Sequence, residues 1–226
     1  MKNIELVVFD MAGTTVNEDN VVYKTLCKAI NQKGHSVTLD FVLEHGAGKE
    51  KHQAIKDVLA AKYNSSKFEI ESQDIFNDFK IQLNEAYDKL EVKSYNGIEE
   101  LITVLKKSKI KIALNTGYSS KIANLLLTKM GWQLGMQYDT LITADDVSNG
   151  RPQPDMILKA MEELKIKEPL KVLKAGDSAI DVEEGKNAGC GITIGVTTGA
   201  QTRKQLEQAN PTYVLDSLIE LSDILV

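Results

Sequence analysis

Residues 4–15 read Ile-Glu-Leu-Val-Val-Phe-Asp-Met-Ala-Gly-Thr-Thr, an apolar run that ends at Asp10 and passes into small residues. A short apolar run rich in β-branched residues predicts a buried strand, here over 4–9. Similar runs predict further strands at 110–115, 140–143, 170–175, 191–196 and 213–215. Apolar residues at helical spacing predict helices at 97–107, 120–130 and 155–164. Strands that alternate with helices predict an α/β fold with a mostly parallel sheet covered on both faces.

One long stretch interrupts this alternation. From about residue 21 to residue 90 the chain shows only helical periodicity, with apolar faces at 23–30, 52–61 and 75–90 and a polar loop at 64–67. This pattern predicts a small all-helical cap domain inserted after the first strand. We place the cap at 18–93 and the α/β core at 1–17 and 94–226.

The bulk composition narrows the class of partner. The 226 residues carry a formal net charge of -5, which gives no electrostatic reason to bind nucleic acid or an anionic membrane. No apolar run is long enough to span a bilayer. Cys27 and Cys190 lie far apart and lack the spacing of metal ligands. We therefore expect a cytoplasmic protein without nucleic acid or membrane partners.

Three predicted strands end in polar or flexible turns, at Asp10, at Thr116-Gly117 and at Asp177. The carboxyl ends of parallel strands share one edge of a sheet, where ligands bind in open α/β folds. A single Asp after a strand is more simply a helix cap. The joint pattern instead favours a Mg²⁺ site, because this ion prefers carboxylates together with phosphate and water. Asp181 follows Asp177 by one helical turn and is expected to support the site.

The same residues suit phosphoryl transfer. An Asp carboxylate can attack phosphorus and form an aspartyl-phosphate, provided that donors and cations hold the phosphoryl oxygens. Thr116 and the backbone N–H of Gly117 are candidate donors. Arg151, in Gly-Arg-Pro-Gln-Pro at 150–154, is the candidate fixed cation. Taken alone, an arginine in such a loop is more often a solvated surface residue.

Four segments in order along the chain resemble the motifs of the haloacid dehalogenase superfamily. They are FDMAGTTV at 9–16, LNTGYSS at 114–120, GRPQPD at 150–155 and AGDSAIDVEEGKNAG at 175–189. The resemblance implies a Rossmann-like core with Asp10 as the nucleophile. It implies Mg²⁺ held by Asp10, the Ala12 carbonyl and Asp177, with Asp181 in support. It gives Thr116 the phosphate-donor role and Arg151 the role usually filled by lysine.

The chain departs from most phosphatases of that superfamily at Ala12, where they carry a second Asp that protonates the leaving alcohol. A methyl group cannot transfer a proton, so ordinary ester hydrolysis loses its general acid. In this respect the chain resembles the phosphonatase branch, the phosphonoacetaldehyde hydrolases and their relatives. That branch has a Gly-x-x-Lys-x-x-His pattern in the cap, which is matched here from Gly46 to His52. The resemblance makes Lys49 the Schiff-base candidate, His52 the proton carrier and Tyr118 a neighbour of the site.

Three functions stay open at this point. The first is a phosphonatase that cleaves the carbon–phosphorus bond of a small aldehyde phosphonate. The second is a phosphatase or mutase acting on a small phosphate ester such as phosphoglycolate, in which water, His52 or another cap group replaces the missing acid. The third is a non-catalytic relative that binds a metabolite or a protein, although the retention of Asp10, Thr116 and Asp177 argues against it. The apolar face of 21–30 could pair two copies through the cap.

Other charged pairs receive a simpler interpretation. Glu162-Glu163 and Glu183-Glu184 are expected to lie on solvated helix faces. Cys190 is expected to pack beneath the last strands.

Overall fold

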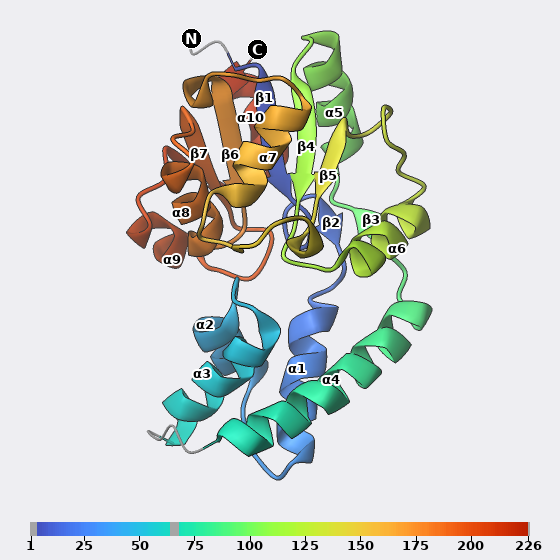
Figure 1. The fold of residues 1–226 in the computed structure, drawn as a ribbon, viewed down its shortest axis with the longest axis vertical. Coiled ribbons are helices and arrows are strands. Elements are labelled where there is room, and N and C mark those ends of the chain that lie inside the picture. The colour runs from blue at the N-terminus through green and yellow to red at the C-terminus, as the bar shows by residue number, and fades with distance from the viewer. Residues whose placement is uncertain (1–3, 64–67, 226) are drawn as a thin grey trace. The chain divides into compact units, whose positions relative to one another are not determined.

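The computed structural model describes residues 4–63 and 68–225 (Figure 1). The loop predicted at 64–67 lies outside these residues. The chain divides into two compact units, a core unit of Met1–Asn17 with Val92–Val226 and a helical unit of Glu18–Glu91. Each unit is described by itself below.

The core unit is built on a six-stranded parallel sheet, which confirms the predicted α/β fold. Its strands, in chain order, are β1 Leu6–Asp10, β4 Lys111–Asn115, β5 Thr140–Ile142, β6 Val172–Gly176, β7 Ile192–Val196 and β8 Tyr213–Leu215. Every residue of β1, β6 and β7 is buried, as expected for strands covered on both faces. The strand predicted at 170–175 begins later, because Pro169–Lys171 forms a 3₁₀ turn, η2.

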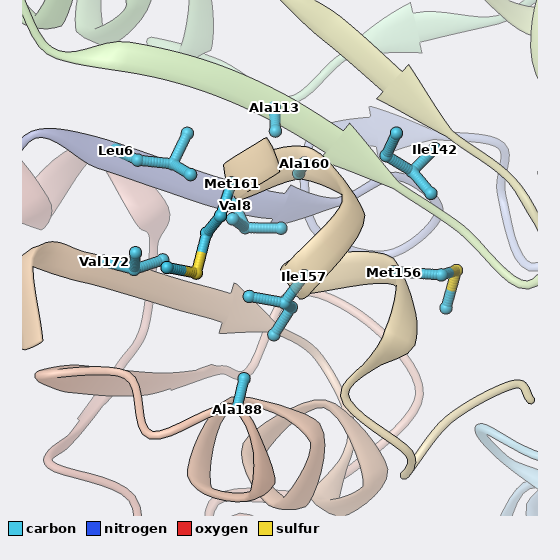
Figure 2. Close-up of a cluster of buried hydrophobic side chains, with 10 residues drawn as sticks. All are labelled: Leu6, Val8, Ala113, Ile142, Met156, Ile157, Ala160, Met161, Val172 and Ala188. Atoms are coloured by element: carbon cyan, nitrogen blue, oxygen red, sulfur yellow. The ribbon is translucent and has the colours of Figure 1, made fainter. Parts of the chain in front are cut away.

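Helices flank this sheet. They are α5 Ile98–Lys107, α6 Ser120–Met130, α7 Asp155–Glu163, α8 Ala179–Asn187, α9 Arg203–Gln208 and α10 Leu221–Leu225, with further 3₁₀ turns η1 Ala144–Asp146 and η3 Leu218–Glu220. Figure 2 shows how α7 closes one face of the sheet. Its buried side chains Met156, Ile157, Ala160 and Met161 pack against Leu6, Val8, Ala113, Ile142 and Val172. Burial of this helical stripe fixes α7 and therefore the loop that precedes it.

The strand order is β5-β4-β1-β6-β7-β8. The chain thus extends the sheet on one side of β1 with β4 and β5, and then returns to the other side with β6, β7 and β8. Such a reversal leaves a crevice at the carboxyl ends of the central strands, which is where open α/β sheets bind ligands. Asp10 lies at the end of β1 in register with Asn115 of β4, and Asp177 directly follows β6.

Two short strands connect the core to the insertion. β2 Val16–Asn17 and β3 Lys93–Ser94 form an antiparallel pair of two residues each. The helical insertion lies between these two short strands, so it follows β1 in the chain as predicted, and β2 forms the first crossing. Strands this short carry no alternating pattern, so the sequence offered no signal for them.

The helical unit comprises α1 Val21–Gln32, α2 Leu39–Gly46, α3 Lys51–Tyr63 and α4 Glu69–Lys89. Its interior consists of apolar side chains from all four helices, Val22, Leu26, Ala29, Ile30, Val42, Ala54, Ile55, Val58, Leu59, Ile75, Phe79 and Tyr87. Helix α2 is not among the predicted elements, although Thr38 is a typical N-cap residue and accepts a hydrogen bond from the Phe41 N–H at 3.2 Å. Among the described residues, no helix combines the length and apolarity needed to cross a membrane.

Candidate active site

Three buried carboxylates meet at the carboxyl edge of the core sheet. They belong to Asp10 at the end of β1, Asp177 after β6 and Asp181 in the first turn of α8. One oxygen of each lies within 4.8 Å of the others, a spacing that would allow all three to hold one metal ion. Their convergence follows from the topology, because β1 and β6 are neighbouring parallel strands.

Two glycines make room for Asp177. A Cβ placed on Gly199 would lie 2.0 Å from Asp177 Oδ2, and one on Gly13 would lie 2.4 Å from it. Gly13 also has a φ of +82°, which side-chain-bearing residues rarely adopt. The Ala200 N–H donates to the same Oδ2 at 2.6 Å. The loop after β7 therefore fixes one oxygen of Asp177, and Gly199 and Ala200 were not among the predicted site residues.

We expect Gly199→Ala to damage the site through this close approach. The added methyl group must displace the Asp177 carboxylate, which costs about 1 to 3 kcal/mol of folding stability. Gly150→Ala is the matched control, because a Cβ there meets no described atom within 4 Å. Chemical denaturation of both variants measures the difference. Equal stability of Gly199→Ala and Gly150→Ala would contradict the crowding around Asp177.

Arg151 places its guanidinium in the middle of the cluster. Nη1 donates to Asp10 Oδ1 at 2.6 Å and lies 2.9 Å from Asp181 Oδ1. Nη2 donates to the backbone and side-chain oxygens of Asn115, both at 2.8 Å. Nε lies 3.1 Å from Glu184 Oε2. Arg151 is thus the cation beside Asp10, rather than a solvated surface residue.

A second cation, Lys174, lies beneath this arrangement. It belongs to β6, is fully buried, and contacts Asn115 Oδ1 at 2.7 Å, Asp181 Oδ1 at 3.0 Å and Glu184 Oε2 at 3.2 Å. The expectation of a solvated Glu183-Glu184 pair is wrong for Glu184, which is fully buried among these groups. The side-chain amide of Asn115 donates to both Glu184 oxygens, at 2.9 and 3.0 Å.

Burial and charge set the protonation of the cluster. Burial raises the pKa of Asp10 to about 6, against the opposing effect of Arg151. Burial, and then the charges of Asp10 and Asp181, raise the pKa of Asp177 well above its ordinary value. Burial acts on Asp181 in the same direction, but Arg151 and Lys174 outweigh it and hold the pKa of Asp181 below its ordinary value.

The charges of the cluster fit a divalent cation. The cluster holds four buried carboxylates, those of Asp10, Asp177, Asp181 and Glu184, and two cations, the partly buried Arg151 and the fully buried Lys174. A +2 ion would balance the excess. Asp181 Oδ1 already lies between Arg151 Nη1 at 2.9 Å and Lys174 Nζ at 3.0 Å, which suits a supporting role for Asp181 rather than a direct bond to the ion. Hard carboxylate oxygens are the donors that Mg²⁺ prefers.

The predicted phosphate-binding residues line the neighbouring strand end. Thr116 is buried after β4, and its hydroxyl accepts a hydrogen bond from the Tyr118 N–H at 3.2 Å, which leaves the hydroxyl proton for another acceptor. The Gly117 Cα faces open space, since a Cβ there would meet no described atom within 4 Å. This segment lies at the same sheet edge as Asp10, because Asn115 pairs in register with Asp10.

The loop after Asp10 is tied to the loop after β7. Thr198 Oγ1 donates to the Gly13 carbonyl at 2.6 Å, and the Tyr95 hydroxyl donates to the Thr198 carbonyl at 2.9 Å. Ala12, whose carbonyl is the predicted metal ligand, forms an isolated bridge with Val16. These hydrogen bonds hold the backbone around Ala12 and Gly13 in one conformation.

Lys49 and His52 lie in the helical unit. Lys49 occupies the turn between α2 and α3, and its ammonium forms an ion pair with Asp57 of α3. His52 Nε2 hydrogen-bonds the Ser72 hydroxyl at 3.1 Å, and its ring stacks on Phe76. The structure thus gives each of these residues a defined partner within its own unit, while their role toward Asp10 remains a prediction.

A buried carboxylate cluster with an arginine, at the switch point of a parallel sheet, is an arrangement suited to metal-assisted hydrolysis. The family model of haloacid dehalogenase-like hydrolases matches residues 7–210, and the chain belongs to this family of enzymes.

Individual relatives point to two kinds of hydrolase. A phosphonoacetaldehyde hydrolase from Latilactobacillus sakei is 29% identical over all of this chain and 96% of its own length. The pyrophosphatase PpaX from Bacillus mycoides is 30% identical over 98% of this chain and 97% of its own length. Among solved structures, a phosphonoacetaldehyde hydrolase-like protein from Oleispira antarctica matches with a TM-score of 0.82 at 23% identity, over 99% of this chain and 91% of that one. The last similarity concerns the fold.

Proposed function

We propose that this chain is a Mg²⁺-dependent phosphonatase-like hydrolase that cleaves the carbon–phosphorus bond of a small aldehyde phosphonate such as phosphonoacetaldehyde. The observation that carries the proposal is the pairing of the buried Asp10 cluster with Ala12 two residues later. The cluster supports attack on phosphorus. Ala12 lacks the acid that an alcohol leaving group needs, so a different leaving-group chemistry is expected.

Asp10 acts as the nucleophile in this proposal. Its Oδ1 is held by Arg151, which also supplies positive charge for the phosphoryl oxygens. The Thr116 hydroxyl and the Gly117 N–H donate to these oxygens. When bound by Asp10, the Ala12 carbonyl and Asp177, with Asp181 in support, Mg²⁺ would supply further charge neutralisation and orientation. Water then hydrolyses the aspartyl-phosphate to release phosphate.

Lys49 prepares the leaving group. Its amine condenses with the aldehyde and releases water, which gives a protonated Schiff base. Attack by Asp10 breaks the carbon–phosphorus bond, and the bonding electrons neutralise the imine as an enamine. Protonation at carbon and hydrolysis by a second water return the amine and release the aldehyde. Asp57 positions the Lys49 side chain through their ion pair, and His52 is the candidate carrier of the proton that the amine must lose.

We expect borohydride to trap Lys49 when phosphonoacetaldehyde is present, because reduction of the Schiff base leaves a stable secondary amine. Lys49→Arg should lower turnover of this substrate by at least about 10³-fold, since arginine cannot form the imine. Peptide mass spectrometry locates the adduct, and phosphate release measures turnover. Lys51→Arg is the matched control, two residues away. Full turnover by Lys49→Arg would exclude the Schiff-base route.

The alternative is a phosphatase that uses the same Asp10 nucleophile on a small monoester such as phosphoglycolate. The similarity to pyrophosphatase PpaX supports keeping it. In that case phosphate esters are turned over, no borohydride adduct forms, and Lys49→Arg raises KM while kcat stays unchanged. A substrate panel with Mg²⁺ therefore separates the two functions.

A further inference from the structure

Lys174 is a fully buried ammonium in a central strand, and the proposed chemistry assigns it no step. It pairs in register with Val8 of β1 and Thr193 of β7, and it lies two residues before the carboxyl end of β6. A Cβ on Gly185 of α8 would lie 2.9 Å from Lys174 Cβ. The helix thus carries a glycine where the lysine stem passes. A buried charge lowers folding stability unless it is paired, so the partners of the Lys174 ammonium indicate its role.

Lys174 and Arg151 share the same three acceptor atoms. Asn115 Oδ1 lies 2.7 Å from Lys174 Nζ and 2.8 Å from Arg151 Nη2. Asp181 Oδ1 lies 3.0 Å from Nζ and 2.9 Å from Nη1. Glu184 Oε2 lies 3.2 Å from Nζ and 3.1 Å from Nε. Each of these oxygens is therefore held between two cations.

Arg151 makes two contacts that Lys174 does not share. Nη1 donates to Asp10 Oδ1 at 2.6 Å, and Nη2 donates to the Asn115 carbonyl at 2.8 Å. Nη1 is therefore divided between Asp10 and Asp181, while Nε faces Glu184. Without a second cation, Asp181 and Glu184 would be neutralised by Arg151 alone, and their attraction would compete with that of Asp10.

We propose that Lys174 is a positioning residue that neutralises Asp181 and Glu184 from below, so that the Arg151 guanidinium stays against Asp10. Lys174 contacts neither of the carboxylate oxygens of Asp10 in the described residues, so it acts through Arg151. This inference deepens the proposed function and relies on it for the kinetic readout. Its structural readout, the Arg151–Asp10 contact, is independent of the substrate.

Lys174→Met tests the proposal, because it keeps much of the side-chain volume and removes the charge. We expect the Arg151 Nη1–Asp10 Oδ1 contact to lengthen beyond hydrogen-bonding distance in its crystal structure. We also expect kcat to fall by about 10²-fold while KM changes little, the effect of misplacing a group in the transition state. Lys171→Met is the matched control, since Lys171 pairs with Glu5 and Glu168 at the surface of the same segment.

The double variant Lys174→Met/Glu184→Gln supplies the specific signature. Removing the acid together with the lysine leaves Arg151 with less competition, so we expect the Asp10 contact to be restored and kcat to recover to within about tenfold of wild type. The double variant also carries the test if Lys174→Met alone does not fold. An intact contact and unchanged kcat in Lys174→Met would overturn the proposal. The proposal would also be overturned by a folded double variant that lacks the Arg151–Asp10 contact, or by failure of both variants to fold. A wild-type chain inactive on phosphonates and phosphate esters would contradict the proposed function alone.

Discussion

Asp10→Asn is expected to abolish turnover, with kcat lowered by at least about 10⁴-fold, because an amide oxygen cannot replace a carboxylate as the nucleophile. The substitution keeps the shape of the side chain and the packing of β1. It also removes one negative charge from a cluster in which four carboxylates face two cations. We therefore expect the variant to fold normally and to be at least as stable as wild type at neutral pH without Mg²⁺.

The measurement combines kcat with the circular dichroism spectrum and thermal unfolding of the purified variant. Asp223→Asn, at an exposed position of α10, is the matched control and should keep wild-type kcat. Retention of more than about one hundredth of wild-type kcat by a folded Asp10→Asn variant would assign the nucleophile to another residue.

Chelation of Mg²⁺ is expected to lower turnover by at least about 10³-fold and to lower the stability of the fold in a pH-dependent way. The second effect follows from the Asp10 pKa of about 6, which burial raises from an ordinary value of 3.8. Below pH 4 the carboxyl is protonated in both the folded and the unfolded chain. Between pH 4 and 6 the unfolded chain loses the proton while the folded chain keeps it, so stability falls as pH rises.

Above pH 6 the Asp10 carboxyl is ionised in both the folded and the unfolded chain, so stability falls no further. The pKa of Asp10 differs by about two pH units between the two states, which corresponds to a loss of about 3 kcal/mol in the free energy of unfolding. Asp177, whose pKa is also raised, acts in the same direction. A divalent ion bound by these carboxylates offsets the cost. We therefore expect the Mg²⁺-induced rise in Tm to grow from pH 5 to pH 8.

Thermal unfolding with and without Mg²⁺ across this range gives the measurement, and Asp10→Asn is the control that removes the titrating group. The wild-type rise in Tm should exceed that of Asp10→Asn, and the excess should grow with pH. A Mg²⁺ effect that is equal in the two proteins at every pH would contradict metal binding at Asp10.

The sequence predicted the edge of the sheet where the chemistry lies, because the positions of strand ends are encoded locally. Buried apolar runs that stop at Asp10, Thr116 and Asp177 lead directly to the crevice at β1, β4 and β6. The strand pair β2–β3 and helix α2 were missed, since two-residue strands carry no periodicity and α2 has only eight residues. Elements this short show too few turns or alternations for their hydrophobic pattern to be distinguished from that of a loop.

The charged network beneath the site could not be predicted from local pattern. Lys171 and Lys174 both lie in the segment predicted as a strand, and Glu183 and Glu184 are adjacent on one helix. In each pair one residue is at least partly exposed and the other is fully buried. Tertiary packing decides which charge turns inward, although a lysine within an otherwise apolar strand was a usable hint. The pairing of Lys49 with Asp57 likewise depends on how the turn meets α3.

The central claim is that the phosphoryl group of the substrate is transferred to the carboxylate of Asp10. Quenching the reaction with acid during turnover tests this claim most directly. Wild-type protein would be mixed with Mg²⁺ and phosphonoacetaldehyde or phosphoglycolate, quenched in acid on the millisecond timescale, and digested for peptide mass spectrometry. We predict a phosphoryl group on the carboxylate of Asp10, absent from Asp10→Asn and lost on exposure to alkali. Turnover without any phosphorylated peptide, or with the phosphoryl group on another residue, would contradict the account.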